Sequence, residues 1–329
     1  MKHKKLVKNI LLVCLTLFAA VAVAACGKKA TGEAAKPVVI YSNADDEAIE
    51  VMKKTLDATD MKGKYKVQVF GTTELGGKLL SEKDNLEADV MTLSTYYLDA
   101  AKSSLTDFKV KADGIDKTEK FQSPILGLEG GLIVNTAALK EAKLPTPTSL
   151  KDLANPVYKN TIAIPNINSS STAWLMIQAL IDTYGESEAK TIFAKILANV
   201  GPNLEDSGSG PIKKLRTGEV AIGFGLRQQG IVDEQAGLPI KVVEVAEGNY
   251  LLTESVALVK HKTMNPNAAK IAEILANETR KELQAYYPAA LYQGEATTKA
   301  KRFPKSLTLE LLKSHQLFTE EAMKAAKGN

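Results

Sequence analysis

Residues 37–60, PVVIYSNADDEAIEVMKKTLDATD, contain the pattern that decides the fold. The β-branched run at residues 37–42 predicts a strand, and the acidic start of residues 45–60 predicts a helix, because the helix dipole favours carboxylates near its N-terminus. The alternation continues with a strand at residues 65–71, a helix at residues 74–85 and a strand at residues 88–94. This order predicts an α/β protein with a mostly parallel sheet flanked by helices.

The rest of the chain repeats these two kinds of element. Further strands are predicted at residues 130–136, 161–166, 220–226, 240–246 and 254–260. Further helices are predicted at residues 172–185, 187–200, 265–287 and 306–327. Because roughly 300 residues exceed what one core usually fills, two domains are expected.

The first residues have the pattern of an export signal. Four lysines precede an apolar run at residues 10–25, which is short for a transmembrane helix of about 20 apolar residues. The ending VAAC resembles a bacterial lipobox, which implies removal of residues 1–25, lipidation of Cys26 (with palmitate among the lipids) and a tether at residues 26–36. We therefore expect a lipid anchor in the cell membrane, with the protein on the extracytoplasmic side. The alternative is an ordinary secretory signal with an incidental cysteine.

The charged and sulfur-containing residues exclude several classes of function. The chain has 42 basic and 38 acidic residues, and removal of four signal lysines balances them, so no nucleic-acid-binding surface is indicated. Cys14 is lost with the signal and Cys26 becomes the anchor, which leaves no disulfide and no cysteine nucleophile. His261 and His315 have no ligand cluster around them in the sequence, so a zinc site is not expected.

Polar turns follow several of the predicted strands. Ligands of open parallel sheets bind beyond the carboxyl ends of the strands. The turns in these places are Ser42–Asn43, Gly71–Thr73, Ser94–Tyr97 and Asn166–Thr172. In the last of them four hydroxyl side chains run from Ser169 to Thr172, whereas one helix N-cap needs only one such residue. We therefore expect this helix start to face a ligand.

The order of the motifs resembles that of solute-binding proteins of bacterial ABC importers. The stretches that carry the resemblance are VVIYSNAD (38–45), EADVMTLS (87–94), GLIVNTAALKEAKLPTPTSLKDLANPVYKNTIAIPN (131–166), GSGPIKKLRTGEVAIGFG (208–225), VALVK (256–260) and NPNAAKIAEIL (265–275). They cover nearly all of the chain after the signal. The resemblance is to the type 2 periplasmic-binding fold, whose members include ferric-iron, phosphonate and sugar-phosphate binders.

The resemblance implies two lobes joined by crossing strands, with the solute in the cleft between them. Residues 37–130 and 256–329 would form lobe 1, and residues 131–255 lobe 2. The lobes would close around the solute, and the protein, as a monomer, would dock on a membrane permease powered by a separate ATPase. The chain has no GxxxxGK[ST] motif, no GxSxG motif and no implied cofactor, so we expect a binding protein rather than an enzyme. A surface adhesin lipoprotein is the alternative outside transport.

The ferric-iron branch of the family carries an adjacent tyrosine pair that this chain lacks. Leu226 and Arg227 stand where those tyrosines would be, and an arginine cannot ligate a cation. Tyr96–Tyr97 and Tyr286–Tyr287 lie elsewhere and are interpreted as packing residues. Ferric iron is therefore kept only as an alternative ligand, and no metal site is predicted.

A cleft rich in hydroxyls and helix starts suits an anionic group such as a phosphonate or an organophosphate. The candidate ligand-binding residues are Ser42, Asn43, Thr72, Thr73, Ser94, Thr95, Ser170, Ser171, Thr172, Arg227, Asn249 and Glu254. Arg227 would form a bidentate pair with the anion, or else lie on the surface. The hydroxyl residues would otherwise be plain caps and turns.

Asp45, Asp46 and Glu47 are explained as partners of the helix dipole. If one of them instead faces the cleft, it would bind an ammonium group, and the solute would be zwitterionic, such as 2-aminoethylphosphonate. Asn249 and Glu254 lie in EGNYLLTE (247–254), which departs from the EGTGYE-like segment of the family. A polyamine binder is the second alternative by ligand, although it would need several carboxylates and aromatic rings in the cleft.

Overall fold

The computed structural model describes residues 36–110, 113–115, 119–295, 301–302 and 308–327. The predicted signal, Cys26 and nearly all of the tether lie outside these residues. Residues from Pro37 onward form one compact unit. Among the described residues no helix is both long and apolar enough to cross a membrane.

The strands that open the chain form the parallel section predicted from the sequence. β1 (Val38–Ser42) lies between β2 (Tyr65–Val69) and β3 (Val90–Ser94), and it pairs parallel with both. The crossover helices are α2 (Asp46–Asp57) and α3 (Thr72–Glu82). Both helices therefore begin just beyond the carboxyl end of a strand.

A second parallel section is built from the middle of the chain. β6 (Ile162–Pro165) pairs parallel with β8 (Ile222–Leu226) and with β7 (Leu204–Glu205). α6 (Thr172–Tyr184) and α7 (Glu186–Val200) follow β6 in the chain. Sequence analysis predicts all of these elements except the two-residue strand β7.

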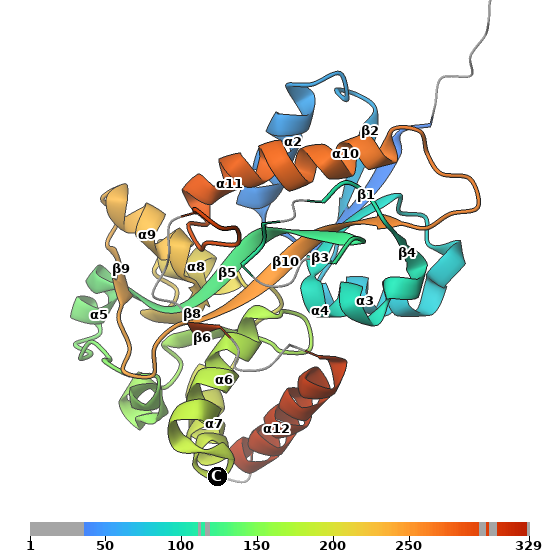
Figure 1. Cartoon of the computed structure of the whole chain (residues 1–329). Coiled ribbons are helices and arrows are strands. Elements are labelled where there is room, and N and C mark those ends of the chain that lie inside the picture. The colour runs from blue at the N-terminus through green and yellow to red at the C-terminus, as the bar shows by residue number, and fades with distance from the viewer. Residues whose placement is uncertain (1–35, 111–112, 116–118, 296–300, 303–307, 328–329) are drawn as a thin grey trace, which may run out of the picture. The chain divides into compact units, whose positions relative to one another are not determined.

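Two long strands connect the sections, so that the sheet runs in the order β2-β1-β3-β10-β5-β8-β6-β7. β10 (Tyr250–Val259) pairs antiparallel with β3 and with the first half of β5 (Gln122–Asn135). From Gly130 onward β5 pairs instead with β8. Figure 1 shows β5 and β10 running side by side through the molecule. These are the crossing strands that the resemblance implies.

Short elements complete the sheet and its edges. The strands are β4 (Leu105–Thr106), β9 (Ile240–Val243) and β11 (Lys301–Arg302). The helices are η1 (Lys83–Asn85), α4 (Thr95–Ala100), η2 (Lys102–Ser104), α5 (Thr136–Glu141), η3 (Lys151–Ala154), η4 (Pro156–Tyr158), α8 (Gly210–Thr217) and α9 (Arg227–Gln235).

The helix predicted at residues 265–287 is interrupted. It consists of α10 (Ala268–Ile274), a π-helical turn η5 (Leu275–Thr279) and α11 (Arg280–Tyr286). The π turn packs against α2, where the hydroxyls of Thr279 and Thr55 share a hydrogen bond of 2.5 Å. A π turn is a usual way to keep a long helix continuous while its register shifts.

The last helix, α12 (Leu309–Lys327), lies against α7 and α6. Phe318 packs on Phe193 with ring centroids 6.0 Å apart, and Glu321 pairs with Lys190 at 2.5 Å. The sequence places α12 in lobe 1, whereas these partners come from the segment assigned to lobe 2. The lobe boundaries remain a prediction.

An aromatic stack runs from α4 through α6 to α12. The rings of Tyr96 and Trp174 stack at 4.7 Å, and Trp174 stacks on His315 at 5.7 Å. Tyr97 packs on the other side of Tyr96 at 4.7 Å. Burial keeps the pKa of His315 below its ordinary value, so the ring is neutral. Tyr96 and Tyr97 are thus packing residues, as interpreted from the sequence.

Candidate functional site

A pocket of about 770 Å³ lies at the carboxyl ends of β1 and β2 and at the starts of several helices. Its lining includes the following residues predicted to bind ligand: Asn43, Thr72, Ser170, Ser171, Thr172 and Glu254. The first two of these follow β1 and β2, the hydroxyl run precedes α6, and Glu254 lies on β10. The fold therefore brings together residues that are more than 200 positions apart in the sequence.

Three helices begin at this pocket without a capping side chain. The N-cap residues of α3, α6 and α8 are Gly71, Ser171 and Ser209, and all three line the pocket. Within the part of the chain that is described, none of them makes a side-chain capping hydrogen bond. The starts of these helices therefore direct positive potential at the pocket. The first amides of α6 also donate within the loop, to the Ser170 hydroxyl and to the carbonyls of Ser170 and Ser171.

The hydroxyl run before α6 does not act as an N-cap. Ser171 holds the cap position without using its side chain, and the Ser170 hydroxyl accepts a long 3.3 Å hydrogen bond from the amide of Thr172. Ser169 donates to Asp206 at 2.9 Å. The hydroxyls of Ser170, Ser171 and Thr172 are buried in the pocket wall.

The loop before α8 packs closely on this run. A Cβ atom placed on Gly208 would come within 2.2 Å of the Thr172 hydroxyl, so only glycine fits there. Ser207, Gly208 and Ser209 belong to the pocket lining. Sequence analysis does not select these residues, because a tight turn before α8 accounts equally well for their composition.

Carboxylates also line the pocket: Asp45, Asp46, Glu74, Glu205, Asp206 and Glu254. Several are engaged, since Asp46 pairs with Lys213 at 3.0 Å and Glu205 pairs with Lys214 at 3.2 Å. Asp45 caps α2 by accepting from the amide of Ala48 at 3.1 Å, and it also accepts a hydrogen bond from the hydroxyl of Tyr287. Burial raises the pKa of Asp45 to about 6.

Glu254 is the most deeply buried of these carboxylates, with 1% of its surface exposed. Its Oε1 accepts from the side-chain amide of Asn43 at 2.6 Å, and the same amide donates to the Thr72 hydroxyl at 2.8 Å. Burial raises the pKa of Glu254 to about 8, and the hydrogen bond from Asn43, which lowers the pKa, offsets only part of this. The nearby charge of Asp45 adds to the rise.

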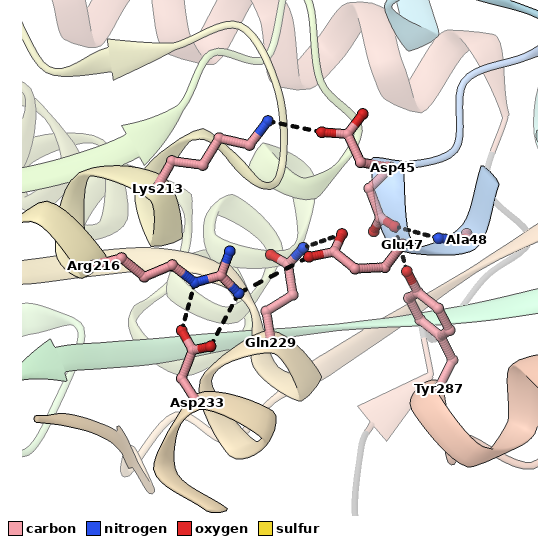
Figure 2. A network of polar contacts seen from close by, with 9 residues as sticks. Asp45, Glu47, Ala48, Lys213, Arg216, Gln229, Asp233 and Tyr287 are labelled. Atoms are coloured by element: carbon pink, nitrogen blue, oxygen red, sulfur yellow. Dashed lines mark hydrogen bonds and ion pairs between the residues drawn. The ribbon is translucent and has the colours of Figure 1, made fainter. Parts of the chain in front are cut away.

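A polar network links α2 to α8 and α9 beside the pocket (Figure 2). Glu47 accepts from Gln229 at 3.0 Å, and Arg216 lies 3.9 Å from Glu47. Arg216 is held in place by two hydrogen bonds to Asp233, at 2.8 and 3.0 Å. Together with the pair between Lys213 and Asp46, these contacts join the first part of the chain to the middle part.

The other predicted residues lie outside the described lining of the pocket: Ser42, Thr73, Ser94, Thr95, Arg227 and Asn249. Ser42 shares a hydrogen bond of 2.6 Å with Thr92, and Thr95 bonds to Ser255 and to the carbonyl of Thr253. Thr73 lies next to the pocket residue Thr72 on α3, and Ser94 lies opposite Glu254 in the β3–β10 register.

Arg227 and Asn249 meet at a second carboxylate, Glu129. Asn249 donates to Glu129 at 3.1 Å, and the Nε of Arg227 lies 3.5 Å from it; Arg227 also pairs with Glu244. The preceding residue on each strand, Leu128 on β5 and Leu226 on β8, lines the pocket. Side chains alternate across a sheet, so Glu129 faces away from the pocket and Arg227 pairs with it there.

A metal site does not emerge from these side chains. The described part of the chain holds no group of three or more His, Cys, Asp or Glu placed to bind a metal ion. The pocket instead offers hydroxyls, helix amides and carboxylates, which are groups that bind polar organic solutes through hydrogen bonds and charge.

Comparisons with known proteins agree with a binding role. The family model of bacterial extracellular solute-binding proteins matches residues 97–313, more than half of the chain. An uncharacterized protein of Haemophilus influenzae is 26% identical over 285 residues, which cover 82% of each chain. The spermidine/putrescine-binding periplasmic protein of Salmonella typhimurium is 26% identical over 219 residues, or 60% of this chain and 61% of that protein.

The fold also matches solved structures. The periplasmic binding protein AfuA of Actinobacillus pleuropneumoniae, determined with fructose-6-phosphate bound, superposes with a TM-score of 0.70 at 21% identity. The match covers 89% of this chain and 99% of AfuA. With its periplasmic-binding fold and its family match, the chain belongs to the bacterial extracellular solute-binding proteins, the solute-capturing components of ABC importers, and is a binding protein rather than an enzyme.

Proposed function

We propose that this chain captures a small anionic or zwitterionic solute, a phosphonate or an organophosphate, and delivers it to its permease. The observation that carries the proposal is the meeting of three uncapped helix starts, those of α3, α6 and α8, at one pocket. Helix N-termini bind phosphate-like groups through free amides and the helix dipole. The hydroxyls of Ser170, Ser171 and Thr172 would add donors to the same oxygens.

A binding screen with purified protein tests this function. Methylphosphonate, 2-aminoethylphosphonate, glycerol 3-phosphate, fructose 6-phosphate, spermidine and ferric citrate would each be added in a thermal-shift assay. A solute present at a hundredfold its Kd stabilises the folded protein by about 2.7 kcal/mol. Stabilisation by at least one phosphonate or phosphate ester is expected, and a screen in which all of these leave the melting temperature unchanged would contradict the proposal.

A polyamine is the second candidate solute. Six carboxylates and one lysine line the pocket, and the related protein of Salmonella typhimurium is named for spermidine and putrescine. Two of these carboxylates are already paired with lysines, however, and the helix starts would repel a purely cationic solute. Spermidine as the only stabilising compound in the screen would favour this candidate.

We also propose that residues 37–130 with 256–329 and residues 131–255 form two lobes that close over the pocket, with α12 of the first lobe packed on α6 and α7 of the second. The contacts of Glu47 and Asp46 on α2 with α8 and α9 would then hold the closed form (Figure 2). The apparent Kd of a solute rises when the binding-competent form is less populated. Residues that touch no solute would thereby affect affinity.

Replacing Glu47 by alanine should therefore weaken solute binding by about threefold to fivefold, because a half-exposed polar contact contributes less than about 1 kcal/mol. Isothermal titration with the best solute from the screen measures the change. Glu50→Ala, an exposed acid on the same helix, is the matched control and should keep the original Kd. An unchanged Kd in Glu47→Ala would show that the network does not hold the closed form.

The localisation proposed here is the outer face of the cell membrane, through a lipid on Cys26. The supporting observations are the signal-like residues 1–25 and the family of the chain. Membrane fractionation of a Cys26→Ser variant tests the anchor. Release of the variant into the soluble fraction is expected, and retention in the membrane would contradict it.

A further inference from the structure

We propose that Glu254 and Asn43 form a subsite for a primary ammonium group of the solute, so that the solute is zwitterionic. This inference rests on the proposed function, because the anionic end of the same solute would lie at the helix starts. The subsite is argued from buried acceptors, from the charges around them and from the orientation of one amide.

Two buried oxygens at this place have no donor. Glu254 Oε2 and Asn43 Oδ1 are both inaccessible to solvent and have no hydrogen-bond partner among the described residues. Both residues line the pocket. Buried acceptors are almost always satisfied in folded proteins. The Ser94 hydroxyl faces Glu254 from β3 and can supply one donor, so at least one of the two oxygens is left for a donor from outside the protein.

The orientation of the Asn43 amide follows from its partners. Its NH₂ group donates to Glu254 Oε1 at 2.6 Å and to the Thr72 hydroxyl at 2.8 Å. In the ionised form that an ammonium favours, a carboxylate oxygen accepts and cannot donate, which places the carbonyl oxygen of Asn43 on the other side. Glu254 and Asn43 therefore present acceptors together, and an ammonium group has three donors to offer them.

The charges around Glu254 leave it without a cationic partner. The groups that face it are Asp45 and Asn43 beside α2, Thr72 on α3, Ser94 on β3, Tyr96 on α4 and Tyr287 after α11. Further along the lining, Glu74 adds another acid, while Lys213 is paired with Asp46. None of the facing groups is cationic, so an ammonium would be the first positive charge to reach this carboxylate.

The protonation of Glu254 gives the subsite a measurable signature. Burial raises its pKa to about 8, which favours the protonated acid near neutral pH. An ammonium favours the ionised carboxylate and lowers this pKa, so binding releases a proton. Affinity should then rise as the pH increases from about 6 to about 8. An anion of fixed charge without an amine would show the opposite trend, because it favours the protonated acid.

Calorimetry with 2-aminoethylphosphonate and ethylphosphonate tests the subsite, because the two probes differ by the amine alone. In the wild type the amine compound should bind at least about tenfold more tightly, since hydrogen bonds to charged groups are the strong ones. Titration of this compound in two buffers of different ionisation enthalpy should show more protons released by the wild type than by Glu254→Gln, because the second ionisation of the phosphonate is common to both proteins.

Glu254→Gln keeps the side-chain shape and should abolish most of the preference for the amine compound. Glu129→Gln is the matched control, because Glu129 is also a buried strand carboxylate bonded to an asparagine, yet lies outside the pocket lining. It should keep the preference of the wild type.

Equal affinity of the wild type for both probes would overturn the subsite and leave the proposed function standing. Uptake of a proton when the wild type binds 2-aminoethylphosphonate would likewise overturn the subsite and leave the proposed function standing. This measurement needs no variant. If neither probe binds, the proposed function fails as well, and the subsite is overturned with it.

Discussion

Replacing Arg280 by methionine should lower the free energy of unfolding by about 3–5 kcal/mol. The substitution removes a buried positive charge and leaves the buried acceptors that it bonded without a partner. Arg280 is 0% exposed. Its guanidinium pairs with Glu295 through two hydrogen bonds, at 3.1 and 2.7 Å. It also donates to the carbonyls of Ile125 and Ala289, at 3.3 and 2.9 Å. The side chain thus ties the start of α11 to β5 and to the segment after α11.

The same pair predicts how the variant responds to acid. Burial raises the pKa of Glu295, but the bonds from Arg280 and from the amides of Leu291 and Tyr292 outweigh it and lower the pKa below its ordinary value. A carboxyl with a depressed pKa stabilises the folded state above its unfolded pKa of about 4.3, and this stability is lost as the pH falls. In Arg280→Met the pKa of Glu295 is no longer lowered by the arginine. The free energy of unfolding of this variant should therefore fall less than that of the wild type between neutral pH and acid.

Urea unfolding of both proteins at neutral pH and at about pH 4 measures these two effects. Lys281→Met is the control, because it removes a neighbouring exposed cation from the same helix. A loss of stability in Arg280→Met no larger than that in the control would contradict the argument.

Replacing Ser170, Ser171 and Thr172 together by alanine should weaken binding of a phosphonate by about a hundredfold. A hydrogen bond to a charged group contributes about 1.5–3 kcal/mol, and the loss of two such bonds already gives this factor. The backbone amides at the start of α6 remain in the variant, so residual binding is expected. Calorimetry with the phosphonate that stabilises the wild type best measures the change.

Two controls separate a lost ligand contact from a damaged fold. The melting temperature of the triple variant without ligand should stay close to that of the wild type, because Ser171 contributes no capping hydrogen bond. Ser81→Ala, an exposed hydroxyl on α3 that bonds to its own helix, should leave the Kd unchanged. Normal affinity in the triple variant would mean that these hydroxyls belong only to the pocket wall.

The fold could be predicted from the sequence because its signals are local. The strand at residues 38–42 and the acidic start of α2 can each be recognised from a few neighbouring residues. The crossing strands were expected from the resemblance to the family. The first half of β5 was missed, since QSPILGLE carries a proline and no clear alternation. The packing of α12 on α7 could not be read from the sequence, because the pattern of an amphipathic helix does not show which neighbour covers its apolar face.

The candidate site could be predicted mainly where it follows a strand directly, and Glu254 was selected only as a member of the segment at residues 247–254. Asn43 and Thr72 come right after β1 and β2, and the hydroxyl run comes after β6. The bond between Asn43 and Glu254 joins residues 211 positions apart. No local pattern marks such a pair.

Arg227 shows a second limit of sequence reasoning. Its position just after β8 suggested a ligand contact, but its partner Glu129 lies on β5 and faces away from the pocket. The register between β5 and β8 decides this, and a change of one residue in that register would reverse the face. Glu205 and Asp206 belong to the segment EDSGSGP (205–211), which a tight turn before α8 explains equally well, so they were not selected.

The aromatic stack contains an intrinsic fluorescence probe of the protein's conformation. Trp174 is the only tryptophan of the chain, and it is held between Tyr96 on α4 and His315 on α12. Any displacement of α4 relative to α6 alters the surroundings of this single indole, and with them its emission. Solute binding could then be followed in real time through the fluorescence of Trp174 in unlabelled protein. No other tryptophan contributes to this signal.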